Sequence, residues 1–238
     1  MIIGDYVGNF IENELLLTSP ELPHLWKSDT AYYQKDKKLF TKAMGLYFPS
    51  ELIHAICEDV EILSLYNNLM QKAERGIRFY GKTKEEIIKK LREISLQTGL
   101  AQVGTFLHII HLMSSSNDYK PLANVGYRSV NNGSDIERFN AVYQYLLKNF
   151  SGEIMLEEVA AICNMTETSF CRYFKQKTQK TFTYFLNEIR IGHAKKLLQN
   201  EHLPIKEICY ECGYNNPTNF FKFFKLIVKK ARKNIEIL

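Results

Sequence analysis

Residues 165–179 read MTETSFCRYFKQKTQ, and residues 214–227 read YNNPTNFFKFFKLI. Both stretches begin with small polar residues, carry apolar residues at helical spacing, and place a basic residue two positions before a Phe-Lys pair. This pattern predicts an amphipathic helix in each stretch, with one apolar face buried. Its occurrence twice, about fifty residues apart, indicates an internal duplication of one small structural unit.

A short helix is predicted before each of these stretches, and the two short helices also correspond to each other. The matched residues, in order, are Val159, Ala160, Cys163, Asn164, Phe170 and Phe174 in the first copy and Ile208, Cys209, Cys212, Gly213, Phe220 and Phe224 in the second. Asn164 and Gly213 fit a sharp turn, because Gly and then Asn best tolerate a left-handed backbone. Small residues at 160 and 209 let two helices cross closely. The sequence therefore predicts two helix-turn-helix motifs.

The second helix of such a motif enters the DNA major groove and presents its outer face to bases and phosphates. Arg pairs with guanine, Asn pairs with adenine, and an aromatic ring contacts the thymine methyl group. A helix from about Thr181 to Gln199 joins the motifs, so one chain is expected to contact two successive major-groove segments. The residues expected to face DNA are Thr166, Glu167, Thr168, Cys171, Arg172 and Lys175 in the first motif and Asn216, Thr218, Asn219, Phe221, Lys222 and Lys225 in the second.

The charge distribution favours a nucleic-acid partner for the last hundred residues. The chain has 238 residues and a net charge of +5. From Phe139 to Leu238 there are 15 Lys and Arg against 9 Glu, and the remaining 138 residues carry a net charge of −1. Positive charge attracts the phosphate backbone. Five cysteines without a scaffold-like spacing, no secretory signal and no long apolar run predict a cytoplasmic protein without membrane contact.

Composition also divides the chain into three parts. Residues 114–135 are rich in Ser, Asn and Gly and lack helical periodicity, which predicts a linker. Before it, Met1 to Leu25 has short apolar runs between turn residues, typical of a few strands, and Pro49 to Met113 has helical spacing. The predicted fold is mainly α, with a small β part and helices in residues 1–113 and an all-α domain in residues 136–238.

The last hundred residues resemble the DNA-binding domain of the AraC/XylS transcription regulators. The likeness lies in residues 156–198, including Arg190, Ala194 and Leu197 of the linker helix, and in the signature ECGYNNPTNFFKFFK at 211–225. It implies a bacterial regulator whose all-α domain binds promoter DNA and contacts RNA polymerase nearby. The sequence departs from the family pattern at Gln179, where the family has Gly. It departs again where Lys229, Arg232, Ile235 and Glu236 replace a Gly, a Pro and a Tyr-Arg pair.

Residues 4–29, GDYVGNFIENELLLTSPELPHLWKSD, resemble the later strands of the cupin-like sensor domain found in many such regulators. The resemblance implies that residues 1–113 form a partial sensor and dimerisation region. A small-molecule effector and a second copy of the chain are then further partners. The early strands of the barrel have no counterpart, so either the true start lies upstream or the regulator is truncated.

A few residues bear on other classes of function, namely metal binding, redox chemistry and catalysis. Cys209 and Cys212 form a CxxC pair, but they lack a second ligand pair and fall on a predicted buried face, which favours packing over a metal or redox site. His108 and His111 lie three apart on a helix, and their apolar neighbours favour packing. No Gly-rich phosphate loop or Ser-His-Asp set stands out, so neither enzymatic activity nor a cofactor is predicted. The alternative function is a truncated regulator or anti-activator that acts through protein–protein contacts.

Overall fold

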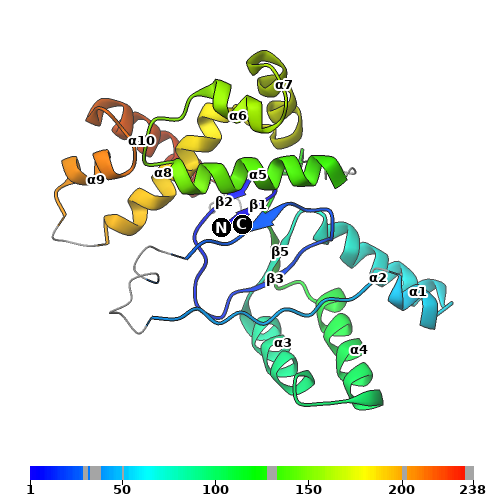
Figure 1. Cartoon of the computed structure of the whole chain (residues 1–238). Helices are drawn as coiled ribbons and strands as arrows, with labels where there is room; N and C mark the ends of the chain where they lie inside the picture. Colours follow the sequence, from blue (N-terminus) through cyan, green and yellow to red (C-terminus); the bar gives the residue numbers. More distant parts are fainter. Residues whose placement is uncertain (29–31, 33–38, 50, 128–132, 200–202, 234–238) are drawn as a thin grey trace. The chain divides into compact units, whose positions relative to one another are not determined.

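The computed structural model describes residues 1–28, 32, 39–49, 51–127, 133–199 and 203–233. The chain forms two compact units, of which the first consists of Met1–Asn9, Pro23–Leu25 and Gly126–Leu238 and the second of Phe10–Leu22 and Trp26–Val125. Most of the described elements are helices and the strands are short, which confirms the prediction of a mainly α fold with a small β part (Figure 1). The boundaries at 113 and 136 stay predictions.

The second unit packs helices against a small antiparallel sheet. In this sheet β5 (Ile77–Phe79) lies between β3 (Leu15–Leu17) and β6 (Tyr119–Pro121). The sequence pattern does not predict β5 or β6, because three-residue strands are too short to show alternation. Its helices are α1 (Leu52–Ile56), α2 (Val60–Ala73), α3 (Gly81–Ile94) and α4 (Gly99–Ser115).

Helix α4 differs from its prediction in the placement of its histidines. It buries Phe106, Ile109 and Met113, which belong to the single core shared by the helices and the sheet of this unit. His108 and His111 therefore lie on the other side of the helix and are exposed, so the expectation that they pack is wrong. Within the described residues, no group of three or more His, Cys, Asp or Glu side chains is arranged to hold a metal ion.

The first unit begins with a sheet in which β1 (Ile2–Ile3) lies between β2 (Tyr6–Val7) and β4 (His24–Leu25). These elements confirm the prediction of short strands before residue 25. Ile2 is fully buried in the core that also contains Tyr143 and Phe185. The amino-terminal strands are thus part of the same compact unit as the helices that follow residue 126.

Those helices are α5 (Gly133–Asn149), α6 (Leu156–Ile162), α7 (Glu167–Thr178), α8 (Phe182–Leu197), α9 (Ile205–Glu211) and α10 (Pro217–Lys233). We call α6 and α7 the first helix pair, and α9 and α10 the second helix pair. In Figure 1 the first pair lies on one side of α8 and the second pair on the other. None of the helices in the described part of the chain combines the length and the apolar character needed to cross a bilayer.

The two helix pairs share the same local structure at their turns. The backbone N–H of Met165 donates to the Ala160 carbonyl at 3.0 Å, and that of Tyr214 donates to the Cys209 carbonyl at 3.1 Å. Asn164 has a φ of 54° and Gly213 a φ of 78°, so both adopt the left-handed conformation predicted for them. The duplication seen in the sequence is therefore also a duplication of backbone geometry.

Both departures from the family pattern have a structural outcome. Gln179 ends α7 with a φ of 57°, a left-handed conformation that costs a non-Gly residue about 1 kcal/mol. Its side-chain amide donates to the Gln176 carbonyl at 2.8 Å. Helix α10 continues through residues 226–233, because this stretch contains neither Gly nor Pro to end it. Ile235 and Glu236 lie outside the described residues.

Candidate nucleic-acid interface

Helix α7 has one buried face and one exposed face. Phe170 and Phe174 are completely buried and pack against Phe182 of α8. The residues that the sequence predicts to face DNA all lie on the exposed side, namely Thr166, Glu167, Thr168, Cys171, Arg172 and Lys175. The hydrophobic core thus covers one side of α7 and leaves the other side exposed.

Two of these residues also stabilise the start of α7. The Thr166 hydroxyl accepts a hydrogen bond from the Ser169 backbone N–H at 3.3 Å and so caps the helix. Glu167 lies in the first turn, where a negative charge stabilises a helix without any DNA contact. Arg172 and Lys175, by contrast, form no ion pair within the described part of the chain. Both side chains are exposed on the outer side of α7.

Helix α10 has the same arrangement. Phe220 is 2% exposed in the second core, whereas Phe221 is 53% exposed on the outer side. The Asn216 side-chain oxygen accepts a hydrogen bond from the Asn219 backbone N–H at 2.9 Å and so caps α10, at the position that corresponds to Thr166 of the first helix pair. The predicted DNA-facing residues Asn216, Thr218, Asn219, Phe221, Lys222 and Lys225 are all exposed.

Helix α7 is also held from α5 by a polar cluster that the sequence did not reveal. The Tyr173 hydroxyl donates to a carboxylate oxygen of Asp135 at 3.0 Å, and the Lys177 ammonium lies 3.2 Å from the other oxygen. Burial raises the pKa of Asp135, but Lys177, Tyr173 and Arg138 together hold that pKa below its usual value. The carboxylate stays ionised near neutral pH and ties the carboxy-terminal half of α7 to α5.

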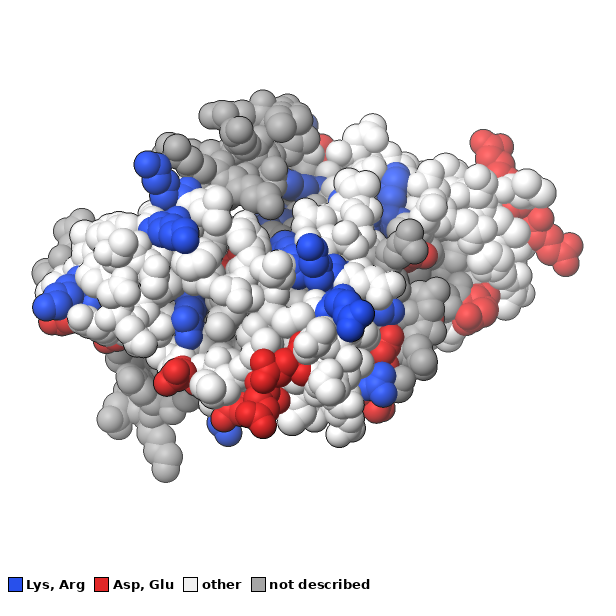
Figure 2. Space-filling view, turned by 90° about the horizontal axis from the view of Figure 1, so that it is seen from above, with Lys and Arg blue, Asp and Glu red and all other residues white. Residues whose placement is uncertain are grey.

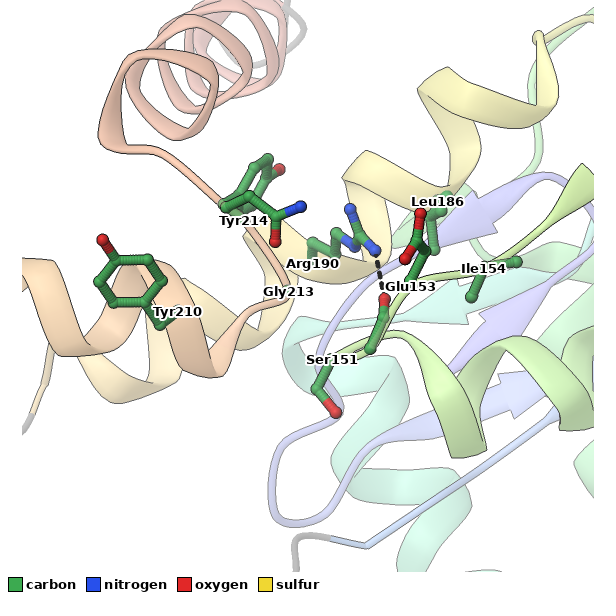
Figure 3. Close-up of a pocket in the computed structure, with 10 residues that line it drawn as sticks. Ser151, Glu153, Ile154, Leu186, Arg190, Tyr210, Gly213 and Tyr214 are labelled. Carbon is green, nitrogen blue, oxygen red and sulfur yellow. Dashed lines mark hydrogen bonds between the residues drawn. The ribbon is translucent and has the colours of Figure 1, made fainter.

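A second unpredicted cluster lies where the two helix pairs meet. Arg190 of α8 donates from Nε to the Phe150 carbonyl and from its terminal nitrogen to the Gly152 carbonyl, both at 2.8 Å. Figure 3 shows this side chain between Tyr214 and the turn that contains Ser151. The sequence signal for this cluster is a pair of polar residues, Asn187 and Arg190, spaced three apart on a largely buried helix face.

The cysteines divide by burial. Cys209 and Cys212 are completely buried, which confirms the predicted inner face of α9. Burial raises the pKa of Cys212 to about 12, so the thiol stays protonated at neutral pH and is a poor nucleophile or metal ligand. Cys171 is exposed on α7. The CxxC pair therefore acts in packing.

On the face that Figure 2 displays, the basic side chains do not gather in one patch. The Lys and Arg side chains are scattered and lie among uncharged and acidic residues. Scattered basic side chains are suited to contact phosphates along a duplex.

The two helix pairs are similar to known helix-turn-helix proteins. Residues 159–231 match a family model described as a helix-turn-helix domain. The HTH-type transcriptional activator RhaS of Klebsiella pneumoniae (strain 342) is 31% identical over 88 residues, which cover 37% of this chain and 32% of RhaS. The activator RhaR of Mannheimia succiniciproducens is 29% identical over 91 residues, which cover 38% of this chain and 33% of RhaR.

Among solved structures, the C-terminal domain of AraT, a response regulator from Geobacillus stearothermophilus, is 34% identical. The match covers 37% of this chain and 74% of that domain, with a TM-score of 0.35. The matched segment spans about a third of the length of the curated relatives.

Proposed function

We propose that this chain, whose carboxy-terminal part is an AraC-type helix-turn-helix domain homologous to the activators RhaS and RhaR, is a sequence-specific transcription regulator. In this proposal α7 and α10 are the two recognition helices, and they enter successive major-groove segments of promoter DNA. RNA polymerase is then a second partner, contacted near the promoter. The protein acts by binding, without catalysis and in the cytoplasm.

One observation carries this proposal. The outward faces of α7 and α10 are exposed at every predicted DNA-facing position, whereas Phe170, Phe174 and Phe220 on their inner faces are buried. The same turn geometry precedes both helices. A helix that is fixed on one side and exposed on the other, and that occurs twice, suits the reading of two adjacent half-sites.

For residues 1–113 we retain the proposal of a sensor and dimerisation region. Support comes from α4, where Leu100, Val103 and Leu107 are exposed and follow helical spacing along one side. An exposed apolar stripe of this kind favours a second copy of the chain as its partner. A small-molecule effector would act on the same region.

Substitutions on α7 test the proposal by separating base reading from phosphate contact. Arg172→Ala should cost about 1–3 kcal/mol of specific binding and relax the preference at one base position, if the guanidinium pairs with guanine. Lys175→Ala should weaken binding to all DNA sequences alike and reduce the slope of log affinity against log salt concentration by about one. Footprinting of the promoters that flank the gene for this protein, together with binding titrations at several salt concentrations, measures both effects.

Lys148→Ala removes an exposed charge from α5, outside both recognition helices, and serves as the control. Unchanged base preference in Arg172→Ala would exclude direct reading by this residue. A wild-type chain that binds no promoter DNA would instead favour the alternative, a truncated regulator or anti-activator that acts through protein–protein contacts.

A further inference from the structure

The two helix pairs have separate hydrophobic cores. The first core contains Phe170 and Phe185, the second contains Cys209 and Phe220, and among the described residues the two share no buried side chain. Helix α8 contributes to both, with Phe185 in the first core and Ile191 in the second. The placement of one pair relative to the other therefore depends on α8 and on any contact that bridges the pairs directly.

Arg190 makes such a bridge. Its guanidinium donates to the carbonyls of Phe150 and Gly152 in the turn that leads into the first pair. The same guanidinium carbon lies 5.5 Å from the centre of the Tyr214 ring, in the turn of the second pair. Hydrogen bonds from a charged group and a cation–π contact both restrict geometry more than apolar packing does. One side chain of α8 thus holds both turns (Figure 3).

Tyr214 is fixed from its other end as well. Its hydroxyl donates to the side-chain oxygen of Asn187 at 2.7 Å, and the Asn187 amide donates to the Thr183 carbonyl at 2.7 Å. Tyr214 and Asn187 are each only 4% exposed, so water does not compete for these hydrogen bonds. We call Asn187, Arg190 and Tyr214 the clasp.

Gly213 brings the backbones of the two parts into direct contact beside the clasp. A Cβ atom at this position would lie 2.6 Å from the Phe150 carbonyl oxygen and 3.0 Å from the Ser151 backbone. Only glycine fits this approach, and the φ of +78° favours glycine as well. Rotation of the second pair about α8 would therefore break the clasp and separate this close contact.

We propose that the clasp sets the distance and phase between the two recognition helices, and that Arg190 and Tyr214 thereby determine which half-site spacing the domain accepts. The inference rests on the proposed function and requires no contact between these two residues and DNA. Half-sites read from one face of a duplex lie about 10–10.5 base pairs apart, so one added base pair rotates the second site by about a tenth of a turn. If the two recognition helices are held rigidly, the second one loses contact with the rotated half-site. If they are loosely held, the second one can move with it.

The test measures binding of the full chain to operators whose spacer is shortened or lengthened by one, two or three base pairs. Wild type should lose about tenfold in affinity for the first added base pair, whereas Arg190→Gln should lose about threefold or less. Tyr214→Phe, which removes only the hydroxyl, should fall between them. Lys148→Gln loses the same charge as Arg190→Gln at an exposed site on α5 and should keep the wild-type profile.

Binding to an isolated half-site should be unchanged in all these variants, which separates a positioning role from a general loss of structure. Arg190→Gln and wild-type profiles that run parallel across the spacer series would overturn the inference, even if the variant bound more weakly throughout. If circular dichroism shows that Arg190→Gln is unfolded, the Tyr214→Phe profile decides by the same criterion. A wild-type chain that binds no DNA would refute the proposed function, whereas binding that ignores the spacer would refute only the clasp.

Discussion

Asp5→Ala is expected to destabilise α5 and α8 by about 3 kcal/mol, although Asp5 lies far from both helices in the sequence. The Asp5 carboxylate is completely buried and lies 3.6 Å from the Lys180 ammonium, which also donates to the Asp5 carbonyl at 2.6 Å. Lys180 is itself only 10% exposed and pairs with Glu188 of α8 at 2.8 Å. Removal of the Asp5 carboxylate leaves the largely buried Lys180 ammonium with one of its two carboxylate partners, Glu188.

Native-state hydrogen exchange of the full chain measures this effect, because it reports the stability of each helix separately. Tyr143→Phe should lower the protection of the same helices by a smaller amount, about 1 kcal/mol, since it removes the hydrogen bond from the hydroxyl to the Gly4 carbonyl. Glu137→Ala changes an exposed residue of α5 and should have little effect. Unaltered exchange of α8 amides in Asp5→Ala would show that the amino-terminal strands do not support the helices.

Ala160→Leu is expected to abolish DNA binding, whereas Cys209→Leu should shorten the footprint by about one helical turn and leave the first half bound. Both residues lie at the crossing of a helix pair, and Ala160 is 2% exposed and Cys209 completely buried. Neither position has free volume for a leucine side chain, so the two helices that cross there must move apart. The first core also holds Tyr143, Phe185 and the amino-terminal strand β1, so disruption at Ala160 reaches most of the unit.

Footprints of both variants on the same promoter decide between these outcomes. Ala160→Gly and Cys209→Ala reduce side-chain volume at the same places, and each should retain the complete footprint with somewhat lower affinity. Complete loss of binding in Cys209→Leu, together with a partial footprint in Ala160→Leu, would show that the second pair provides the main contact.

Features encoded by neighbouring residues were predicted from the sequence. The turns at Asn164 and Gly213 each depend on a single residue that tolerates a left-handed backbone. The burial of the two Phe-containing faces follows from the helical repeat alone. These local signals were sufficient to predict both helix pairs and the faces that they expose.

Contacts between distant residues were not predicted. No local pattern links Asp5 to Lys180 or Arg190 to the Phe150 carbonyl. The Asp5–Lys180 contact depends on tertiary placement, and Arg190 uses a backbone acceptor that every sequence contains. The exposure of His108 was mispredicted for a related reason. Apolar neighbours in sequence do not specify which side of a helix a residue occupies when the helix is apolar on several sides.

The discontinuous composition of the first unit has a consequence for synthesis on the ribosome. Gly4 and Asp5 emerge before their partners Tyr143 and Lys180, which follow 139 and 175 positions later. At about 5–20 residues per second, Asp5 waits roughly 9–35 s for Lys180 to be made. The second unit, which spans most of the intervening chain, is complete before then and can fold earlier. The nascent strands β1 and β2 therefore form before the helices that complete their core, and the unit that contains α7 and α10 closes after the second unit.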